Sequence, residues 1–245
     1  MPQPILYIGL DVHARKIAVA TADEDRRGEV RQHSIIANTT TALESLVKKL
    51  SAGRELRVCY EAGPCGYVIA RQMEKKGIPC TVAAPSLIPR GPGDRIKTDR
   101  RDAQLLARLH RAGELTAVHI PDETDEAMRD LCRARTDAVQ DKRRAQSQLK
   151  AFLLRHGRHL MDKPPWSEAR QRTLRAITLP HPAQKIVLEE YISAVEAAHQ
   201  RIARIEQQME LLLPDWRQAP SVRALMGMRG FRIVAAMITV SELGD

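Results

Sequence analysis

Residues 5–13 read ILYIGLDVH, and this stretch decides which fold the sequence predicts. Four of its first five residues are large and apolar, Gly9 permits close approach of another backbone, and Asp11 follows where a buried strand should end. The next stretch, residues 16–23, alternates and then reaches charge, so residues 12–15 are typical of a tight connection between antiparallel strands. The sequence therefore predicts a central strand that ends in a carboxylate, a position suited to chemistry.

The residues that follow continue an α/β pattern. We predict a strand over 29–36, an amphipathic helix over 38–50, a strand over 57–60 that ends at Glu61, a helix over 67–76 and a strand over 78–83. Three strands, a helix, a strand, a helix and a strand form the order of the ribonuclease-H/RuvC fold. The opening strand and hairpin are also similar to those of actin-like sugar kinases. We expect the first alternative, an α/β fold with a mixed sheet and flanking helices.

Helices are predicted for the rest of the chain. Residues 94–112 predict a helix with Asp99 and Asp102 near its start, where a spacing of three puts both side chains on one face. From residue 125 apolar residues recur every seven positions, and residues 188–212 carry apolar residues at alternating spacings of three and four. We expect a basic coiled-coil hairpin or a dimer. The predicted domains are 1–124 (catalytic), 125–215 (coiled coil) and 216–245 (an incomplete helical domain).

Composition limits the class of partner. Lys and Arg outnumber Asp and Glu by 39 to 30, which gives a formal charge of +9 and favours an anionic polymer or an anionic membrane. No apolar run approaches the ~18 residues of a membrane span, so we expect a cytoplasmic protein and no membrane partner. Aromatic residues make up only 3% of the chain, which favours phosphate contacts over stacked bases. The four cysteines lack zinc-site spacing and are interpreted as reduced thiols.

Four carboxylates are the candidate catalytic and metal-binding residues. Asp11 and Glu61 end adjacent predicted strands, and Asp99 and Asp102 share a helix face, so one cluster is feasible. Four oxygen donors suit Mg²⁺, and two such ions roughly 3.5–4 Å apart can promote phosphodiester cleavage. The alternative is that Asp99 caps the helix, with Asp102 stabilised by the helix dipole. His13 beside this strand is more typical of a packing or surface histidine.

Basic residues around these acids and along the coiled coil are the candidate nucleic-acid contacts, with a solvated helix face as the alternative for the coiled coil. They are Arg95, Lys97, Arg100, Arg101, Arg133, Lys142, Arg143, Arg144 and Lys150. Near the end of the chain, residues 227–232 read GMRGFR and loosely resemble half of a helix-hairpin-helix element, a motif that grips phosphates through backbone amides.

Three motifs carry a resemblance to a known family. GLDVH at 9–13, YEAGPCGY at 60–67 and KTDRRDA at 97–103, with the basic helices and LMGMRGFRIVAAMITVSELGD at 225–245, resemble the insertion-sequence one-ten (IS110) family of DEDD transposases, related to the Piv invertases. The resemblance implies a RuvC-like DEDD site at Asp11, Glu61, Asp99 and Asp102. It further implies a bacterial, nucleoid-associated DNA recombinase that uses Mg²⁺ and a structured guide RNA.

The same resemblance sets the alternatives. Family members carry a serine nucleophile in a carboxy-terminal domain, and the sequence is expected to end before that motif; Ser241 lies in the preceding predicted helix and is not assigned the role. A catalytically incomplete nucleic-acid-binding remnant is therefore one alternative, and an actin-like kinase is a weaker one. A recombinase that holds two DNA partners is expected to form a homo-oligomer through the coiled coil.

Overall fold

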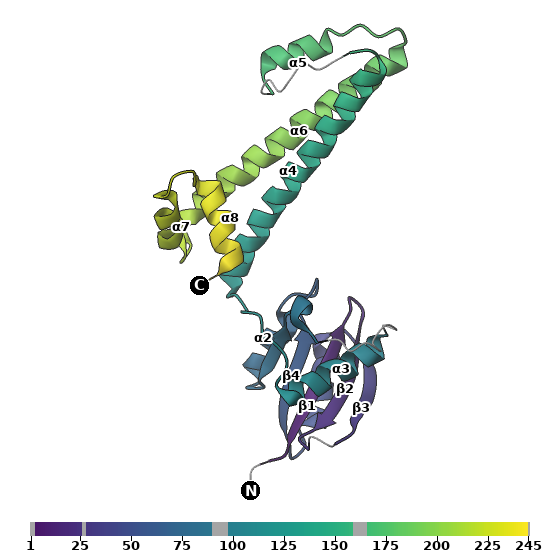
Figure 1. The fold of residues 1–245 in the computed structure, drawn as a ribbon, viewed down its shortest axis with the longest axis vertical. Helices are drawn as coiled ribbons and strands as arrows, with labels where there is room; N and C mark the ends of the chain where they lie inside the picture. Colours follow the sequence, from purple (N-terminus) through teal and green to yellow (C-terminus); the bar gives the residue numbers. More distant parts are fainter. Residues whose placement is uncertain (1–2, 26–27, 90–97, 159–165, 245) are drawn as a thin grey trace. The chain divides into compact units, whose positions relative to one another are not determined.

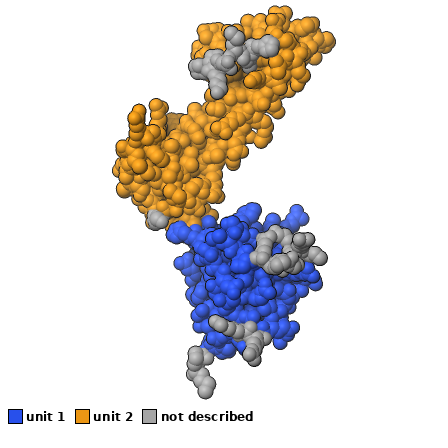
Figure 2. All heavy atoms as spheres, in the orientation of Figure 1, with its two compact units in different colours: residues 1–120 blue, residues 121–245 orange. Residues whose placement is uncertain are grey.

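The computed structural model describes residues 3–25, 28–89, 98–158 and 166–244. The chain divides into two compact units, residues 1–120 and residues 121–245 (Figure 2). Each unit has its own hydrophobic core, so each is described by itself.

The first unit is built on a five-stranded sheet (Figure 1). Its strands are β1 (Ile5–Val12), β2 (Lys16–Asp23), β3 (Val30–Ala37), β4 (Glu55–Glu61) and β5 (Cys80–Ala83), in the order β3-β2-β1-β4-β5. β1, β2 and β3 pair antiparallel, whereas β4 is parallel to both β1 and β5. The predicted α/β class with a mixed sheet is confirmed, and β1 is the central strand.

One face of this sheet carries the main apolar core. Leu6, Ile8 and Leu10 of β1 point to this face and are nearly fully buried. They pack with apolar side chains of α1 (Thr40–Leu50) and α2 (Val68–Lys75). Thr39 caps α1 through its side-chain oxygen, which accepts a hydrogen bond from the Ala42 amide. The short 3₁₀ helix η1 (Pro85–Leu87) follows β5.

The opposite face is covered by a single helix, α3 (Asp99–Ala112), which packs against β1 and β2. A Cβ atom on Gly9 would lie 2.3 Å from the Ala103 carbonyl oxygen and 2.4 Å from the Ala107 nitrogen. Ala103 and Ala107 also pack on the small side chains of β2, with both alanines fully buried. The helix therefore lies unusually close to the sheet because glycine and alanine line the contact.

Arg111, in the last turn of α3, hydrogen-bonds this end of the helix to the β2–β3 connection. Its guanidinium Nη1 donates hydrogen bonds to the carbonyl oxygens of Asp23, Asp25 and Gly28, at 3.3, 3.0 and 2.8 Å. Gly113 in the left-handed conformation then ends the helix. The C-terminal end of α3 is thus held to the β2–β3 connection.

The second unit is helical wherever it is described. Its two long helices are α4 (Glu123–Arg155) and α6 (Pro182–Leu212). They pack side by side as an antiparallel pair formed within one chain (Figure 1). A short helix not predicted from the sequence, α5 (Glu168–Arg175), precedes α6. The unit continues through a 3₁₀ turn, η2 (Leu213–Asp215), into α7 (Ala219–Met226) and α8 (Ile233–Leu243).

The repeat of seven predicted the contact between these long helices. Ala138, Ala145 and Phe152 of α4 are buried, as are Val195 and Ile202 of α6. Two positions depart from the predicted face. Ile192 is fully buried where Tyr191 is only partly so, and Leu212 is 47% exposed because Leu213, just past the helix, packs into the core instead.

Polar contacts join the first part of α4 to residues 216–217 and to the end of α8. Asp125, buried in the first turn of α4, accepts hydrogen bonds from the Trp216 indole at 2.7 Å and from Arg217. Arg129 donates to the Ser241 carbonyl oxygen, and Arg133 forms two hydrogen bonds with Glu242, at 2.8 and 2.9 Å.

Among the described residues, no helix is long and apolar enough to cross a membrane.

Candidate metal centre

The ends of β1 and β4 place two of the predicted carboxylates on the face covered by α3. Tyr7, Gly9 and Asp11 alternate onto that face, as do Cys59 and Glu61 of β4. The parallel register pairs Gly9 with Cys59 and Leu10 with Tyr60, so one further step sets Asp11 opposite Glu61. Glu61 is exposed, at the last position of its strand.

The β1–β2 hairpin and the start of α3 bring further groups to Asp11. The His13 Nε2 atom lies 3.1 Å from Asp11 Oδ2 and 3.4 Å from Asp99 Oδ1. Lys16, the first residue of β2, forms a close ion pair with Asp99. One ligand atom from each of Asp11, His13 and Asp99 can be chosen so that all lie within 4.8 Å of one another, which is a spacing suited to a metal ion.

The structure shows which residue caps α3. Thr98 caps α3, because its hydroxyl oxygen accepts a hydrogen bond from the Arg101 amide at 3.4 Å. Asp99 is thus the first residue inside the helix, and its carboxylate contacts His13 and Lys16. The alternative that Asp99 caps the helix is wrong, whereas a metal-binding role for Asp99 stays a prediction.

The charges of the cluster act on one another. Partial burial raises the pKa of the Asp11 carboxyl; His13 opposes this shift, whereas the carboxylates of Asp102 and Asp99 add to it. The hydrogen bond from Lys16 lowers the pKa of Asp99. Asp102 therefore acts on Asp11 electrostatically, although it is not in the group of three with ligand atoms in close proximity.

The predicted and observed sites overlap in part. Ligand atoms of Asp11 and Asp99 lie within 4.8 Å of one another, and the carboxylate of Asp102 helps to raise the pKa of Asp11. Glu61 ends the neighbouring strand and lies outside this close group. The sequence analysis did not select Lys16, and it interpreted His13 as a packing or surface histidine; in the structure His13 is half exposed and contacts Asp11 and Asp99. Their positions two and five residues after Asp11, across a tight hairpin, were the available signal.

The basic residues predicted to bind nucleic acid differ in their surroundings. Arg100 and Arg101 are exposed in the first turn of α3, next to Asp99. Along α4, Arg143 and Lys150 are exposed, Lys142 is half-buried, and Arg144 lies 3.8 Å from Asp141. Arg133 is already engaged by Glu242. Arg95 and Lys97 lie outside the described residues.

The GMRGFR stretch connects α7 to α8. Gly230 has φ of +96°, which favours glycine, and Arg229 and Arg232 are exposed. Ser241 is buried in α8, and its hydroxyl donates to the Ile238 carbonyl oxygen at 2.9 Å. That burial agrees with the expectation that Ser241 has no catalytic role.

Comparison with known proteins gives consistent matches. A protein-family model for the DEDD transposases of IS110 elements, whose description is "Transposase", matches residues 8–157. The chain is 43% identical over 240 residues to "Putative transposase y4qE" of Sinorhizobium fredii, an alignment that covers 98% of this chain and 58% of that protein. It is 29% identical over 243 residues to the "Transposase for insertion sequence element IS1533" of Leptospira borgpetersenii, covering 98% of this chain and 70% of that protein. The chain thus spans a little over half the length of the first relative.

Proposed function

Because the chain belongs to the IS110 family of insertion-sequence transposases, we propose that it acts in DNA transposition through magnesium-dependent phosphodiester chemistry at Asp11, Glu61, Asp99 and Asp102. The observation that supports this proposal best is the convergence of Asp11 and Asp99 from the central strand and the covering helix. Asp99 is followed in α3 by the exposed Arg100 and Arg101, which can meet a phosphate backbone.

The donors fit a hard divalent cation. Carboxylate oxygens are the ligands that Mg²⁺ prefers. Burial, with a smaller contribution from the carboxylates of Asp102 and Asp99, raises the pKa of Asp11. When bound, Mg²⁺ would polarise the phosphate and favour formation of the attacking oxygen nucleophile. We assign Asp11 and Asp99 as its first ligands, with Asp102 and Glu61 completing the set.

Lys16 and His13 have a separate role in this proposal. Lys16 and His13 hold Asp99 and Asp11 in place and offset their repulsion before an ion binds. Lys16 and His13 stand at the rim of the cluster, about half exposed, where they can also contact a phosphate oxygen.

The partners belong to the proposal as well. DNA would be bound through backbone phosphates by Arg100, Arg101 and the exposed basic residues of α4, and the family resemblance adds a structured guide RNA. We further propose a homo-oligomer and a cytoplasmic, nucleoid-associated location. An actin-like kinase is disfavoured, since the transposase family model matches residues 8–157, which include the five-stranded sheet.

The test is cleavage of a supercoiled plasmid that carries insertion-sequence ends, with and without Mg²⁺ and guide RNA. Asp102→Asn should lower the Mg²⁺-dependent rate by at least ~100-fold, as expected for loss of a group that stabilises transition-state charge. Glu114→Gln, a charge change at an exposed position just past α3, is the matched control. Unchanged cleavage by Asp102→Asn would remove the site assignment, and nucleic-acid binding without any cleavage would favour the remnant alternative.

A further inference from the structure

His13 brings a nitrogen atom to the candidate metal centre, beside the four carboxylates proposed as ligands. Its Nε2 atom lies 3.1 Å from Asp11 Oδ2 and 3.4 Å from Asp99 Oδ1. Two ligands at neighbouring positions of an octahedral ion, each about 2.1 Å from the metal, are about 3.0 Å apart. The two distances from Nε2 are close to this value, so the three side chains are already spaced as ligands around one ion.

The two oxygen atoms of Asp99 are divided between Lys16 and His13. Lys16 forms its ion pair with Oδ2, whereas Oδ1 is the oxygen that faces the imidazole of His13. The ammonium group thus occupies one oxygen and leaves the other to a cation. An ion that binds between Asp99, His13 and Asp11 would therefore not have to break the ion pair of Lys16.

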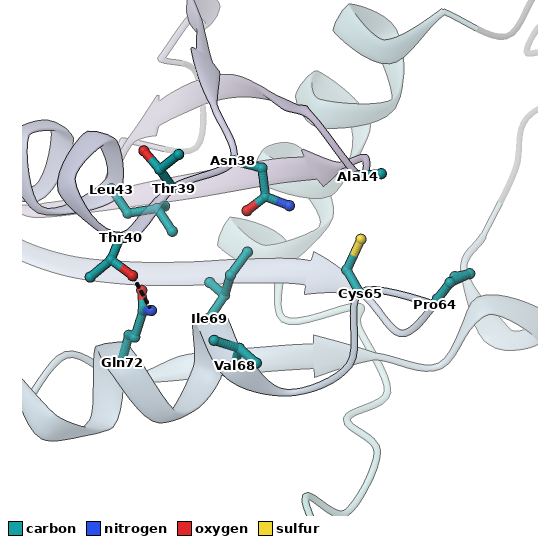
Figure 3. Close-up of a pocket in the computed structure, with 10 residues that line it drawn as sticks. All are labelled: Ala14, Asn38, Thr39, Thr40, Leu43, Pro64, Cys65, Val68, Ile69 and Gln72. Atoms are coloured by element: carbon teal, nitrogen blue, oxygen red, sulfur yellow. Dashed lines mark hydrogen bonds between the residues drawn. The ribbon is translucent and has the colours of Figure 1, made fainter.

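The turn that carries His13 is held by several hydrogen bonds. The His13 amide donates to the Lys16 carbonyl oxygen at 2.9 Å, and Asn38 donates its side-chain amide to the His13 carbonyl oxygen, also at 2.9 Å. The Cys65 thiol donates to the Val12 carbonyl oxygen at 3.8 Å. Figure 3 shows Asn38 and Cys65 beside this turn, where both line one pocket. A ligand on a backbone fixed in this way loses little conformational freedom when it coordinates an ion.

We propose that His13 is a direct ligand of the ion at this centre, through Nε2, and that it makes the site prefer Mn²⁺ over Mg²⁺. The inference rests on the proposed function, because Asp11 and Asp99 must bind the same ion. Mg²⁺ selects oxygen ligands, whereas first-row transition metals also bind imidazole nitrogen. Sites that combine carboxylates with histidine hold manganese or iron in helical-bundle proteins.

Coordination replaces the hydrogen bond that His13 shares with Asp11. The ion accepts the Nε2 lone pair and an oxygen of Asp11, and the neutral imidazole then carries its proton on Nδ1. The same pair of side chains therefore has two roles. They hold each other before the ion binds, and both become ligands afterwards.

Electron paramagnetic resonance of Mn²⁺ tests whether His13 is a ligand. The full chain is titrated with Mn²⁺ alone, and loss of the free-ion spectrum gives the Kd. Electron spin-echo envelope modulation then detects coupling of the bound ion to a coordinated imidazole nitrogen. We expect this coupling in the native protein, and we expect Mg²⁺, added as a competitor, to bind about tenfold more weakly than Mn²⁺, a difference of about 1.4 kcal/mol.

Two substitutions of His13 separate a ligand from a neighbour. The His13 side chain is 49% exposed, so we expect both variants to fold, as checked by circular dichroism. His13→Ala should remove the nitrogen coupling and weaken Mn²⁺ binding about tenfold. His13→Gln retains an oxygen at a similar reach, so it should keep Mg²⁺ binding and lose the nitrogen coupling. The matched control is His119→Ala, an exposed histidine of the first unit outside the group of three, which should behave as the native protein.

A nitrogen coupling that is absent from the native protein, or that persists in His13→Ala, would overturn the assignment of His13. Equal affinity of the native protein for the two ions would overturn the preference for Mn²⁺. Asp11→Asn separates this inference from the proposed function. If only the His13 assignment is wrong, Mn²⁺ binding and cleavage still require Asp11. If the acidic site itself is wrong, Asp11→Asn binds Mn²⁺ as the native protein does, and the inference fails with it.

Discussion

Asp11 carries its charge at a cost to the folded protein. Burial raises the pKa of this carboxyl, so the folded state retains the proton to higher pH than the unfolded state. The associated stability is present below the ordinary value of 3.8 and is lost as the pH rises through the raised pKa. At neutral pH the charged Asp11 therefore destabilises the first unit, and a bound cation would relieve this.

Asp11→Asn should consequently raise the Tm of the first unit at pH 7 without Mg²⁺, by about 2 °C, and the gain should shrink towards pH 4. Added Mg²⁺ should raise the Tm of the native sequence and leave the variant unchanged, because an ion stabilises only a state that binds it. Differential scanning calorimetry measures both effects, with Glu114→Gln as control. An equal Mg²⁺ response in Asp11→Asn would argue against a metal at this residue.

Gly9 is the position at which a single methyl group should do the most damage. A Cβ atom there meets the backbone of α3 at 2.3 and 2.4 Å, and backbone cannot swing aside as a flexible side chain can. Gly9→Ala should cost about 2–4 kcal/mol in free energy of unfolding and move the start of α3 away from Asp11. Urea unfolding measures the loss.

The control for this substitution is Gly63→Ala. A Cβ at Gly63 comes no closer than 3.9 Å to its nearest neighbour, the Glu61 carbonyl oxygen, so its stability should change little. If Gly9→Ala and Gly63→Ala unfold at the same urea concentration, the close contact between α3 and the sheet is not as tight as the structure shows.

At this scale the sequence predicted residue types better than contacts. Asp11, Asp99 and Asp102 were selected because carboxylates at strand and helix ends suit a cation, and the structure brings them within electrostatic reach. The ion pair of Lys16 with Asp99 joins residues 83 positions apart in the sequence. It depends on how closely α3 approaches the sheet, which no local pattern reveals.

Among the helices, the start of α4 shows how a buried charge can be kept. Burial would raise the pKa of Asp125, but hydrogen bonds from Arg217 and Trp216 outweigh it, and the net shift is downward. The stability that results is present above the ordinary pKa of 3.8 and is lost as the pH falls through the lowered value. This carboxylate therefore joins α4 to the turn before α7 at neutral pH.

Asp125→Ala should lower the free energy of unfolding by about 2–3 kcal/mol, because it leaves the Trp216 N–H buried without an acceptor. Asp125→Asn should retain part of the contact and flatten the loss of stability at acid pH. Chemical unfolding of the variants between pH 3 and 7 gives both values. Asp215→Asn, an exposed neighbour, should follow the native profile; a similar profile for Asp125→Asn would contradict this explanation.

Elements were predicted well where a period or a cap was present in the sequence. The apolar repeat located α4 and α6, and proline at 182 and glycine at 157 mark where these helices begin and end. Helix α5 was missed because its eight residues carry one buried apolar side chain, Leu174, and hence no period. Ile192 is fully buried in place of Tyr191, although Leu188, Val195, Ile202 and Met209 keep a strict spacing of seven and are all buried.

For the molecule as a whole, its positive charge should appear as a salt dependence of DNA binding. Arg143 and Lys150 are exposed, seven residues apart, and thus on one side of α4. Replacing both with alanine should weaken duplex binding and reduce the slope of log K against log salt by about 2, since each phosphate contact contributes nearly 1. The control is Lys48→Ala with Lys49→Ala, exposed on α1; equal slopes for the two double variants would remove α4 as a preferred DNA contact.

The hydrogen bonds of Arg111 affect how precisely the other end of α3 is placed. Arg111 holds three carbonyl oxygens at one end of α3, and Asp99 stands twelve residues away at the other end, about 18 Å along the axis. A tilt of α3 by roughly 5° about its C-terminal end would therefore displace Asp99 by about 1.5 Å. Displacements of this size can reduce a reaction rate by about 100-fold. We therefore expect Arg111 to affect how precisely Asp99 is placed in the acidic cluster.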